Sequence, residues 1–175
     1  SPFSAMHSLP LPSHLYMAHR FDEAVNAAMA LHTRVPQYSI HWFLARVHWE
    51  QSRFEQALDE ERLELERRGD TALLAALETC LDAAGPTGAM RFMAEALVTR
   101  ASDSYVDPYD IGETFARAGS IDEALRWLDR AVEHGSYKMT YIAFWPHFDC
   151  LRDDARFQDL LERVYGEKLS DIQLP

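Results

Sequence analysis

Apolar residues recur along this chain at the three- and four-residue spacings of amphipathic helices, and turn-forming residues interrupt them at intervals. The interruptions fall at Val35-Pro36, Gly69-Asp70, Ala101-Ser102 and Gly135-Ser136. Proline cannot continue a helix, and glycine readily takes the left-handed conformation that ends one. Many Ala, Leu, Glu and Arg residues with only 7 Gly and 8 Pro favour helices over strands. The pattern predicts an all-α chain.

The same pattern repeats along the chain as a helix pair. Four alanines occupy the matched position near the start of the second helix: Ala24, Ala57, Ala89 and Ala124, which are 33, 32 and 35 residues apart. Twelve residues before the last three of them stand Ala45, Leu77 and Gly112. Small residues let two helices approach to about 8–10 Å. The second unit fits least well, because Glu61 and Glu64 stand where the other units carry apolar residues.

The segment from Tyr109 to Ala124, YDIGETFARAGSIDEA, carries Gly, aromatic, Gly and Ala at the spacings of a known repeat and is followed by Leu128 and Ala131. It resembles the tetratricopeptide repeat family, as does the stretch from Trp42 to Ala57. The resemblance covers residues 14–136, or about three and a half repeats. It implies a right-handed superhelix of antiparallel helix pairs, with residues 1–13 as an N-terminal lead.

The C-terminal part has a motif of its own. From Trp145 to Phe157 the chain reads WPHFDCLRDDARF, which is similar to a closing segment of certain bacterial repeat proteins. The resemblance implies that residues 137–175 cap the repeats with four apolar side chains: Leu151, Phe157, Leu160 and Leu161. Repeats of this kind follow winged-helix, cyclase or kinase domains, which implies a bacterial signalling or transcription-regulatory protein. We also expect Asp153-Asp154 to cap the helix that starts near Ala155.

Charge and composition exclude several classes of function. The formal net charge is −11 and no run of Lys or Arg exceeds two residues, so we expect no direct contact with nucleic acid. No apolar stretch approaches the roughly 20 residues that a membrane-spanning helix needs, and we expect a cytoplasmic protein. Cys80 and Cys150 cannot form a disulfide framework or a four-ligand zinc site by themselves; Cys80 lies in an apolar segment that predicts a core position.

No catalytic motif is present, so the sequence predicts that the chain is not an enzyme and needs no cofactor. His41 and His48 are seven residues apart on one helix face. Their Cα atoms are therefore about 10 Å apart, too far to share a metal ion without further ligands. We interpret both as packing residues and expect no metal site.

The remaining candidate is the concave groove that the first helices of the pairs would line. Projection of the repeat register places these residues there: Trp42, Arg46, Trp49, Glu78, Tyr109, Glu113 and Arg117. Trp and Arg most often anchor binding energy in protein interfaces. The groove therefore predicts a protein or peptide partner. Lysines occur only at 138 and 168, which argues against the carboxylate clamp of the chaperone-binding subclass.

Two other functions stay open at this stage. A pocket lined by His41, Trp42, His48 and Trp49 would suit a small-molecule sensor, because ligand pockets are concave and mostly apolar. A purely structural dimerisation module would use apolar surface left exposed on the shortened first unit.

Overall fold

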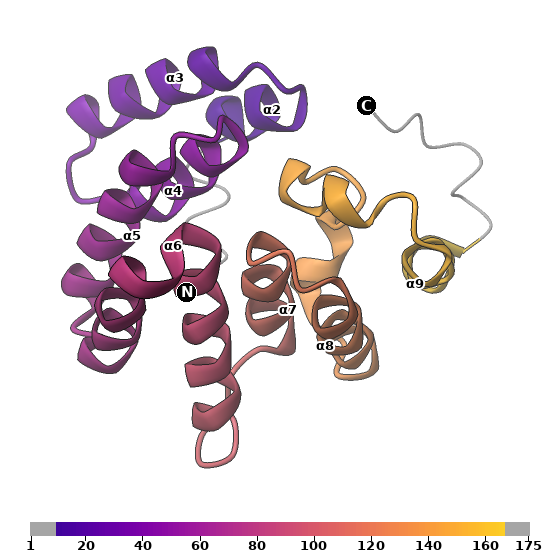
Figure 1. The fold of residues 1–175 in the computed structure, drawn as a ribbon. Helices are drawn as coiled ribbons and strands as arrows, with labels where there is room; N and C mark the ends of the chain where they lie inside the picture. The colour runs from indigo at the N-terminus through magenta and orange to yellow at the C-terminus, as the bar shows by residue number, and fades with distance from the viewer. Residues whose placement is uncertain (1–9, 167–175) are drawn as a thin grey trace. The chain divides into compact units, whose positions relative to one another are not determined.

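The computed structural model describes residues 10–166, except for the side chains of Cys80, Asp82 and Ala83. The chain divides into two compact units, Ser1–Thr71 and Ala72–Pro175, which we call unit 1 and unit 2. In residues 10–166 every regular element is helical, which confirms the all-α prediction (Figure 1). Residues 1–9 of the predicted lead, residues 167–175 of the predicted cap, and the predicted core position of the Cys80 side chain lie outside what is described.

Unit 1 is built from two consecutive helix pairs (Figure 1). The helices are α2 (Pro10–Met17), α3 (Phe21–Arg34), α4 (His41–Glu50) and α5 (Phe54–Arg68). The most extensive packing is of α2 on α3 and of α4 on α5, and α3 also packs on α4. The first helix, α2, is only 8 residues long and has Pro10 and Pro12 in its first turn.

Unit 2 contains α6 (Thr71–Arg100, which starts at the last residue of unit 1), α7 (Pro108–Arg117), α8 (Ile121–Glu133) and α9 (Ala155–Tyr165). Two 3₁₀ segments, η1 (Tyr137–Tyr141) and η2 (Pro146–Leu151), lie between α8 and α9. Gly85 breaks α6 into two helical segments, because its φ of 67° and ψ of −173° are not helical and Pro86 follows. The helices α7 and α8 form the most extensively packed pair of the unit.

All four predicted helix ends are confirmed. The helices α3, α5, α6 and α8 end at Arg34, Arg68, Arg100 and Glu133. Gly69 ends α5 in the left-handed conformation, where its amide reaches back to the carbonyls of the last turn. These ends were predictable because each helix end depends on the few residues next to it in the sequence.

The matched small positions lie where the helices touch. All four matched alanines have side chains that are 0% exposed: Ala24, Ala57, Ala89 and Ala124. In α7, a Cβ atom on Gly112 would lie 2.8 Å from Cγ of Leu128 and 3.2 Å from the carbonyl oxygen of Ala124. Only glycine therefore fits this crossing without a shift of α8.

The second helix pair, α4 and α5, fits the repeat pattern poorly, and the structure explains why. Glu64 is buried in α5, yet its carboxylate accepts hydrogen bonds from Ser39 Oγ at 2.6 Å and from Arg67 at 2.7 and 3.0 Å. Burial alone would raise the pKa of Glu64, but these hydrogen bonds outweigh it and hold the pKa below its usual value. The buried glutamate is tolerated because its charge is paired.

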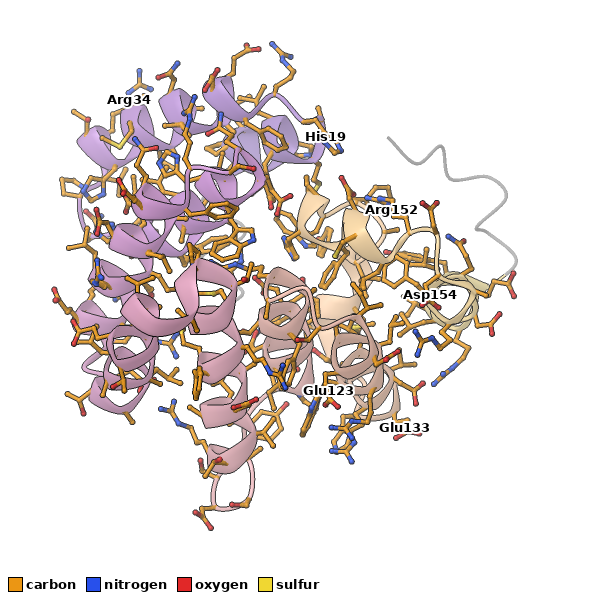
Figure 2. The ribbon with its side chains drawn as sticks, viewed as in Figure 1. His19, Arg34, Glu123, Glu133, Arg152 and Asp154 are labelled. Atoms are coloured by element: carbon orange, nitrogen blue, oxygen red, sulfur yellow. The ribbon has the colours of Figure 1, made fainter. Side chains whose placement is uncertain are left out.

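The C-terminal part of unit 2 is anchored by apolar side chains. The four predicted residues are buried: Leu151, Phe157, Leu160 and Leu161. Asp154 caps α9 as predicted, because its side chain accepts a hydrogen bond from the amide of Arg156 at 2.9 Å (Figure 2). None of the described helices is both long and apolar enough to cross a lipid bilayer.

Candidate functional site

The helices α4 and α7 carry the same pattern of side chains on one face. Ala45 and Gly112 are matched in the repeat register, which aligns three positions of each helix at i, i+4 and i+8. We call Trp42, Arg46 and Glu50 the α4 stripe, and Tyr109, Glu113 and Arg117 the α7 stripe. Each stripe has one aromatic ring followed by two opposite charges, and the order of the charges is reversed between them.

The α7 stripe is in the interior of the protein, although the sequence predicted an open groove. Tyr109, Glu113 and Arg117 are only 4%, 3% and 6% exposed. Part of the cover is the segment η2, which packs on α7. Phe148 meets the ring of Tyr109 edge-on at a centroid distance of 5.6 Å, and the Tyr109 hydroxyl lies 3.4 Å from Nε2 of His147. The Tyr109 end of the α7 stripe is therefore covered by a later segment of the same chain.

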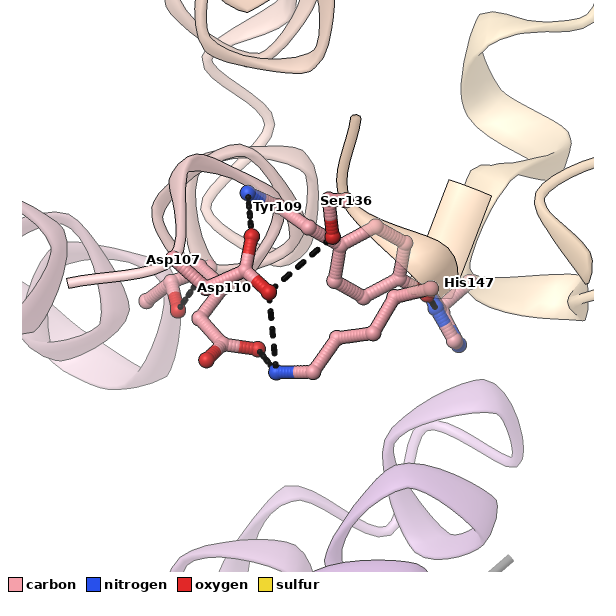
Figure 3. Close-up of polar contacts among 7 residues, drawn as sticks. Asp107, Tyr109, Asp110, Ser136 and His147 are labelled. Atoms are coloured by element: carbon pink, nitrogen blue, oxygen red, sulfur yellow. Dashed lines mark hydrogen bonds and ion pairs between the residues drawn. The ribbon is translucent and has the colours of Figure 1, made fainter. Parts of the chain in front are cut away.

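A polar cluster lies at the N-terminus of α7 beside this stripe (Figure 3). Asp107 caps the helix by accepting a hydrogen bond from the amide of Tyr109, and Ser136 Oγ donates to its other oxygen at 3.0 Å. Lys138 pairs with Asp110, lies 3.8 Å from Oδ2 of Asp107, and sits 5.7 Å from the centre of the Tyr109 ring. These contacts hold the residues that follow α8 against the start of α7.

The Asp110 side chain is 42% exposed, but partial desolvation by the atoms packed around it still raises its pKa above the ordinary value, and Lys138 only partly offsets the effect. The carboxylates of Glu113 and Asp107 push the pKa in the same direction as desolvation does. The sequence analysis missed this cluster, although Asp107-Pro108 is a typical helix start that places two carboxylates in one turn. The part played by Lys138 could not be found from spacing, because it comes from another element.

The α4 stripe is only partly buried. The Arg46 guanidinium carbon lies 5.4 Å from the centre of the Trp42 ring, and its Nη1 donates a hydrogen bond to the Trp42 carbonyl oxygen at 2.6 Å. Phe43 packs edge-on against the Trp42 ring at a centroid distance of 5.8 Å. Both side chains are half-buried, so they are held in place and still reach the surface.

Trp49, the second tryptophan of α4, has a different position. It is buried and packs edge-on against Phe54 at a centroid distance of 5.0 Å. It therefore contributes to the packing of α4 on α5. Of the two tryptophans predicted for the groove, Trp42 is the one with accessible surface.

The two histidines of α4 have separate surroundings. His41 Nδ1 lies 2.6 Å from a carboxylate oxygen of Glu60, whereas His48 is buried. Burial lowers the pKa of His48; Glu60 and Gln51 oppose this shift and Arg53 adds to it. Among the described residues no group of three or more His, Cys, Asp or Glu side chains is placed to hold a metal ion.

Glu78, the remaining predicted groove residue, is exposed on the first segment of α6. Unit 2 also has an open cleft of about 360 Å³, which is lined by Arg91, Glu95, Val98, Thr99, Phe115, Glu123 and Arg126. Its charged residues pair within each wall, Arg91 with Glu95 and Arg126 with Glu123. The cleft was not found from the sequence, because α6, α7 and α8 each supply part of it.

Comparison with known proteins adds no functional information. No protein-family model matches the chain, and neither a curated protein nor a solved structure is significantly similar to it. The functional conclusion therefore rests on the chemistry of the residues described above, and chiefly on the difference between the buried α7 stripe and the accessible α4 stripe.

Proposed function

We propose that this chain is a non-catalytic binding module, built as a tetratricopeptide-like superhelix, that recognises a peptide segment of a partner protein through the α4 stripe. The observation that carries the proposal is the pair of Trp42 and Arg46, which reaches the surface in a fixed arrangement. In line with the resemblance of the C-terminal motif, the partner belongs to a bacterial signalling or transcription-regulatory system in the cytoplasm.

The chemistry of the pair supports recognition of a peptide. Tryptophan offers a large apolar surface and arginine offers several hydrogen-bond donors, and both are enriched among the residues that carry most of the energy of an interface. Because Arg46 is already held against the Trp42 ring and carbonyl, less side-chain freedom is lost when a partner binds. The net charge of −11 supports a protein partner over a nucleic acid.

The small-molecule alternative receives less support from the same geometry. It requires His41, Trp42, His48 and Trp49 to line one pocket. Trp49 packs on Phe54, and His48 is buried. His48 and Trp49 therefore contribute to packing, and His41 contributes the contact with Glu60.

Self-association is a second candidate, and exposed apolar surface on the first helix pair favours it. Leu11 of α2 is 61% exposed and Met29 of α3 is 50% exposed. Light scattering on the eluate of a size-exclusion column would decide it: a dimer that dissociates in a Leu11→Ser, Met29→Ser variant supports this function. A monomer at all concentrations excludes it.

The binding function can be tested with a displayed random-peptide library selected against the purified chain. Fluorescence anisotropy then measures the dissociation constants of selected peptides for the wild type, Trp42→Ala and Arg46→Ala. We expect binding to weaken at least about tenfold in both variants, the usual effect of truncating an anchor residue. Leu63→Ala is the matched control, since it removes an exposed apolar side chain of α5. Equal affinity of Trp42→Ala and wild type would refute the proposal.

A further inference from the structure

Two histidine rings lie side by side where α3 is followed by α4. His32 is in the last turn of α3 and His41 is the first residue of α4; their ring centres are 6.5 Å apart, and the ring planes are inclined by 57°. At the level of sequence His41 was compared with His48 on the same helix, but its ring neighbour in space comes from another helix. Both rings belong to unit 1, and both side chains are half-buried and reach the surface.

The Nδ1 atom of each ring lies against an oxygen that can only accept a hydrogen bond. His41 Nδ1 is 2.6 Å from a carboxylate oxygen of Glu60, and His32 Nδ1 is 3.0 Å from the carbonyl oxygen of Tyr38. An ionised carboxylate and a backbone carbonyl offer no proton. The two contacts therefore place the proton of each neutral ring on Nδ1, and Nε2 is the nitrogen that carries the lone pair.

Histidines that bind metal ions are held in the same way. Such a histidine almost always donates its second ring N–H to a carboxylate or to a backbone carbonyl, which fixes the ring and makes the ligating nitrogen more basic. His41 has the first kind of partner and His32 has the second. The carboxylate of Glu60 also supplies negative charge next to the ring of His41.

The distance between the rings suits one shared ion. Zinc binds an imidazole nitrogen at about 2.0–2.1 Å, which puts the centre of the ring about 3.2 Å from the ion. The centres of two rings on one ion are therefore about 5 Å apart at a tetrahedral angle and about 6.5 Å apart at a linear one. The observed separation of 6.5 Å is at the upper end of this range. Tetrahedral binding would bring the rings about 1 Å closer, a small rotation for two half-buried side chains.

We propose that His32 and His41 form a binding site for one Zn²⁺ ion, which both rings hold through Nε2. Imidazole nitrogen suits zinc, whereas Mg²⁺ and Ca²⁺ prefer oxygen ligands. Among the described residues no set of three His, Cys, Asp or Glu side chains is placed to hold an ion, so water fills the remaining positions. The ion would join α3 to α4 across the loop of residues 35–40. The site does not depend on the peptide-binding function proposed above.

Isothermal titration calorimetry of the full, untagged chain with zinc chloride tests the site. Excess Mg²⁺ in the buffer suppresses nonspecific binding of cations to a chain of net charge −11, and it does not compete for imidazole. We expect one ion per chain, and His32→Ala and His41→Ala should each weaken binding at least about tenfold.

His134→Ala is the matched control. His134 Nδ1 also lies against a backbone carbonyl oxygen, that of Arg130 at 2.8 Å, but no ring contact joins His134 to another described histidine. This variant should leave the affinity for zinc within about twofold of the wild type.

Glu60 is a positioning residue in this site, because it acts on the ion through His41. Glu60→Ala should weaken zinc binding about tenfold, the usual cost of removing such a partner. Long-range ¹H–¹⁵N NMR spectra of the imidazole rings separate this role from a merely structural one. In Glu60→Ala the ring of His41 should lose its preference for a proton on Nδ1, and the ring of His32 should keep it.

The same NMR spectra of the wild type need no variant and stay informative if a substitution prevents folding. Zinc should shift the Nε2 signals of two histidines, assigned to His32 and His41, and leave both Nδ1 atoms protonated. Zinc shifts confined to other histidines, or equal affinity of His32→Ala and wild type, would overturn the proposal. So would the absence of zinc binding in excess Mg²⁺. One ion per two chains, with a zinc-dependent dimer in light scattering, would overturn the assignment of the site to a single chain.

Discussion

Gly112 of α7 and Leu128 of α8 approach so closely that a methyl group on the glycine would lie 2.8 Å from Cγ of the leucine. The contact lies between the two most extensively packed helices of unit 2, α7 and α8. Leu128 is completely buried, so it has little room to move away.

Gly112→Ala should therefore destabilise the protein by about 1–3 kcal/mol, the usual cost of overpacking a core contact. Chemical denaturation with urea measures the loss. In a Leu128→Ala background the same substitution should cost less, because the clashing atom is gone. Equal losses in both backgrounds would show that the contact does not set the helix spacing.

Asp110 should make the stability of the protein fall as the pH rises through the range just above its ordinary pKa. Partial desolvation raises its folded pKa above 3.8. Between these two pKa values the folded state binds more protons than the unfolded state, so the free energy of unfolding decreases with rising pH. Urea unfolding of wild type and Asp110→Asn at several pH values from about 4 to 6 should show this downward contribution only in the wild type.

Lys138→Met provides the matched control for Asp110. Removing the ammonium group takes away the interaction that opposes desolvation, so the pKa of Asp110 should rise further. The decrease of the free energy of unfolding with rising pH should then extend to higher pH values. An unchanged profile would mean that Lys138 does not act on this carboxyl group.

His48 should have the opposite effect on stability. Burial lowers its folded pKa below 6.5, so below pH 6.5 the unfolded state binds more protons. The free energy of unfolding should therefore decrease as the pH falls from 6.5 through the folded pKa. His48→Phe, which introduces the residue found at the matched position of α7, Phe115, should remove this acid-induced loss. Urea titrations at about pH 5 and 7 would test it; an equal loss in variant and wild type would assign it to other groups.

Glu64→Gln should destabilise unit 1 near neutral pH by about 1–3 kcal/mol, because the neutral amide cannot keep the charge-assisted hydrogen bonds with Arg67. The folded pKa of Glu64 is lowered, so its contribution is present above pH 4.5 and is lost as the pH falls through the folded pKa. Urea denaturation should therefore show that the difference in the free energy of unfolding between Glu64→Gln and wild type becomes smaller as the pH is lowered. Glu66 is exposed, so the control Glu66→Gln should change the free energy of unfolding by less than about 0.5 kcal/mol at both neutral and acidic pH.

Much of the local structure followed from the sequence. Gly69 ends α5 and Asp154 caps α9 where their residue types predict, because these signals act over a few residues. The matched alanines were also found at the buried positions, because their spacing reports the period of the repeated helix pair. The candidate site was predicted less well: Trp42 and Arg46 are accessible, whereas Tyr109 is covered by residues 38 positions further along the chain.

The sequence by itself thus determined the helices, their ends and the small residues at their crossings, since each depends on neighbouring residues or on a regular repeat. Only the tertiary structure decided which of two equivalent stripes is accessible and where the charged side chains find partners. Glu64 meets Ser39, and Asp110 meets Lys138, across loops and other helices. The register of a repeat places side chains on a face, but what covers that face depends on where a distant segment packs.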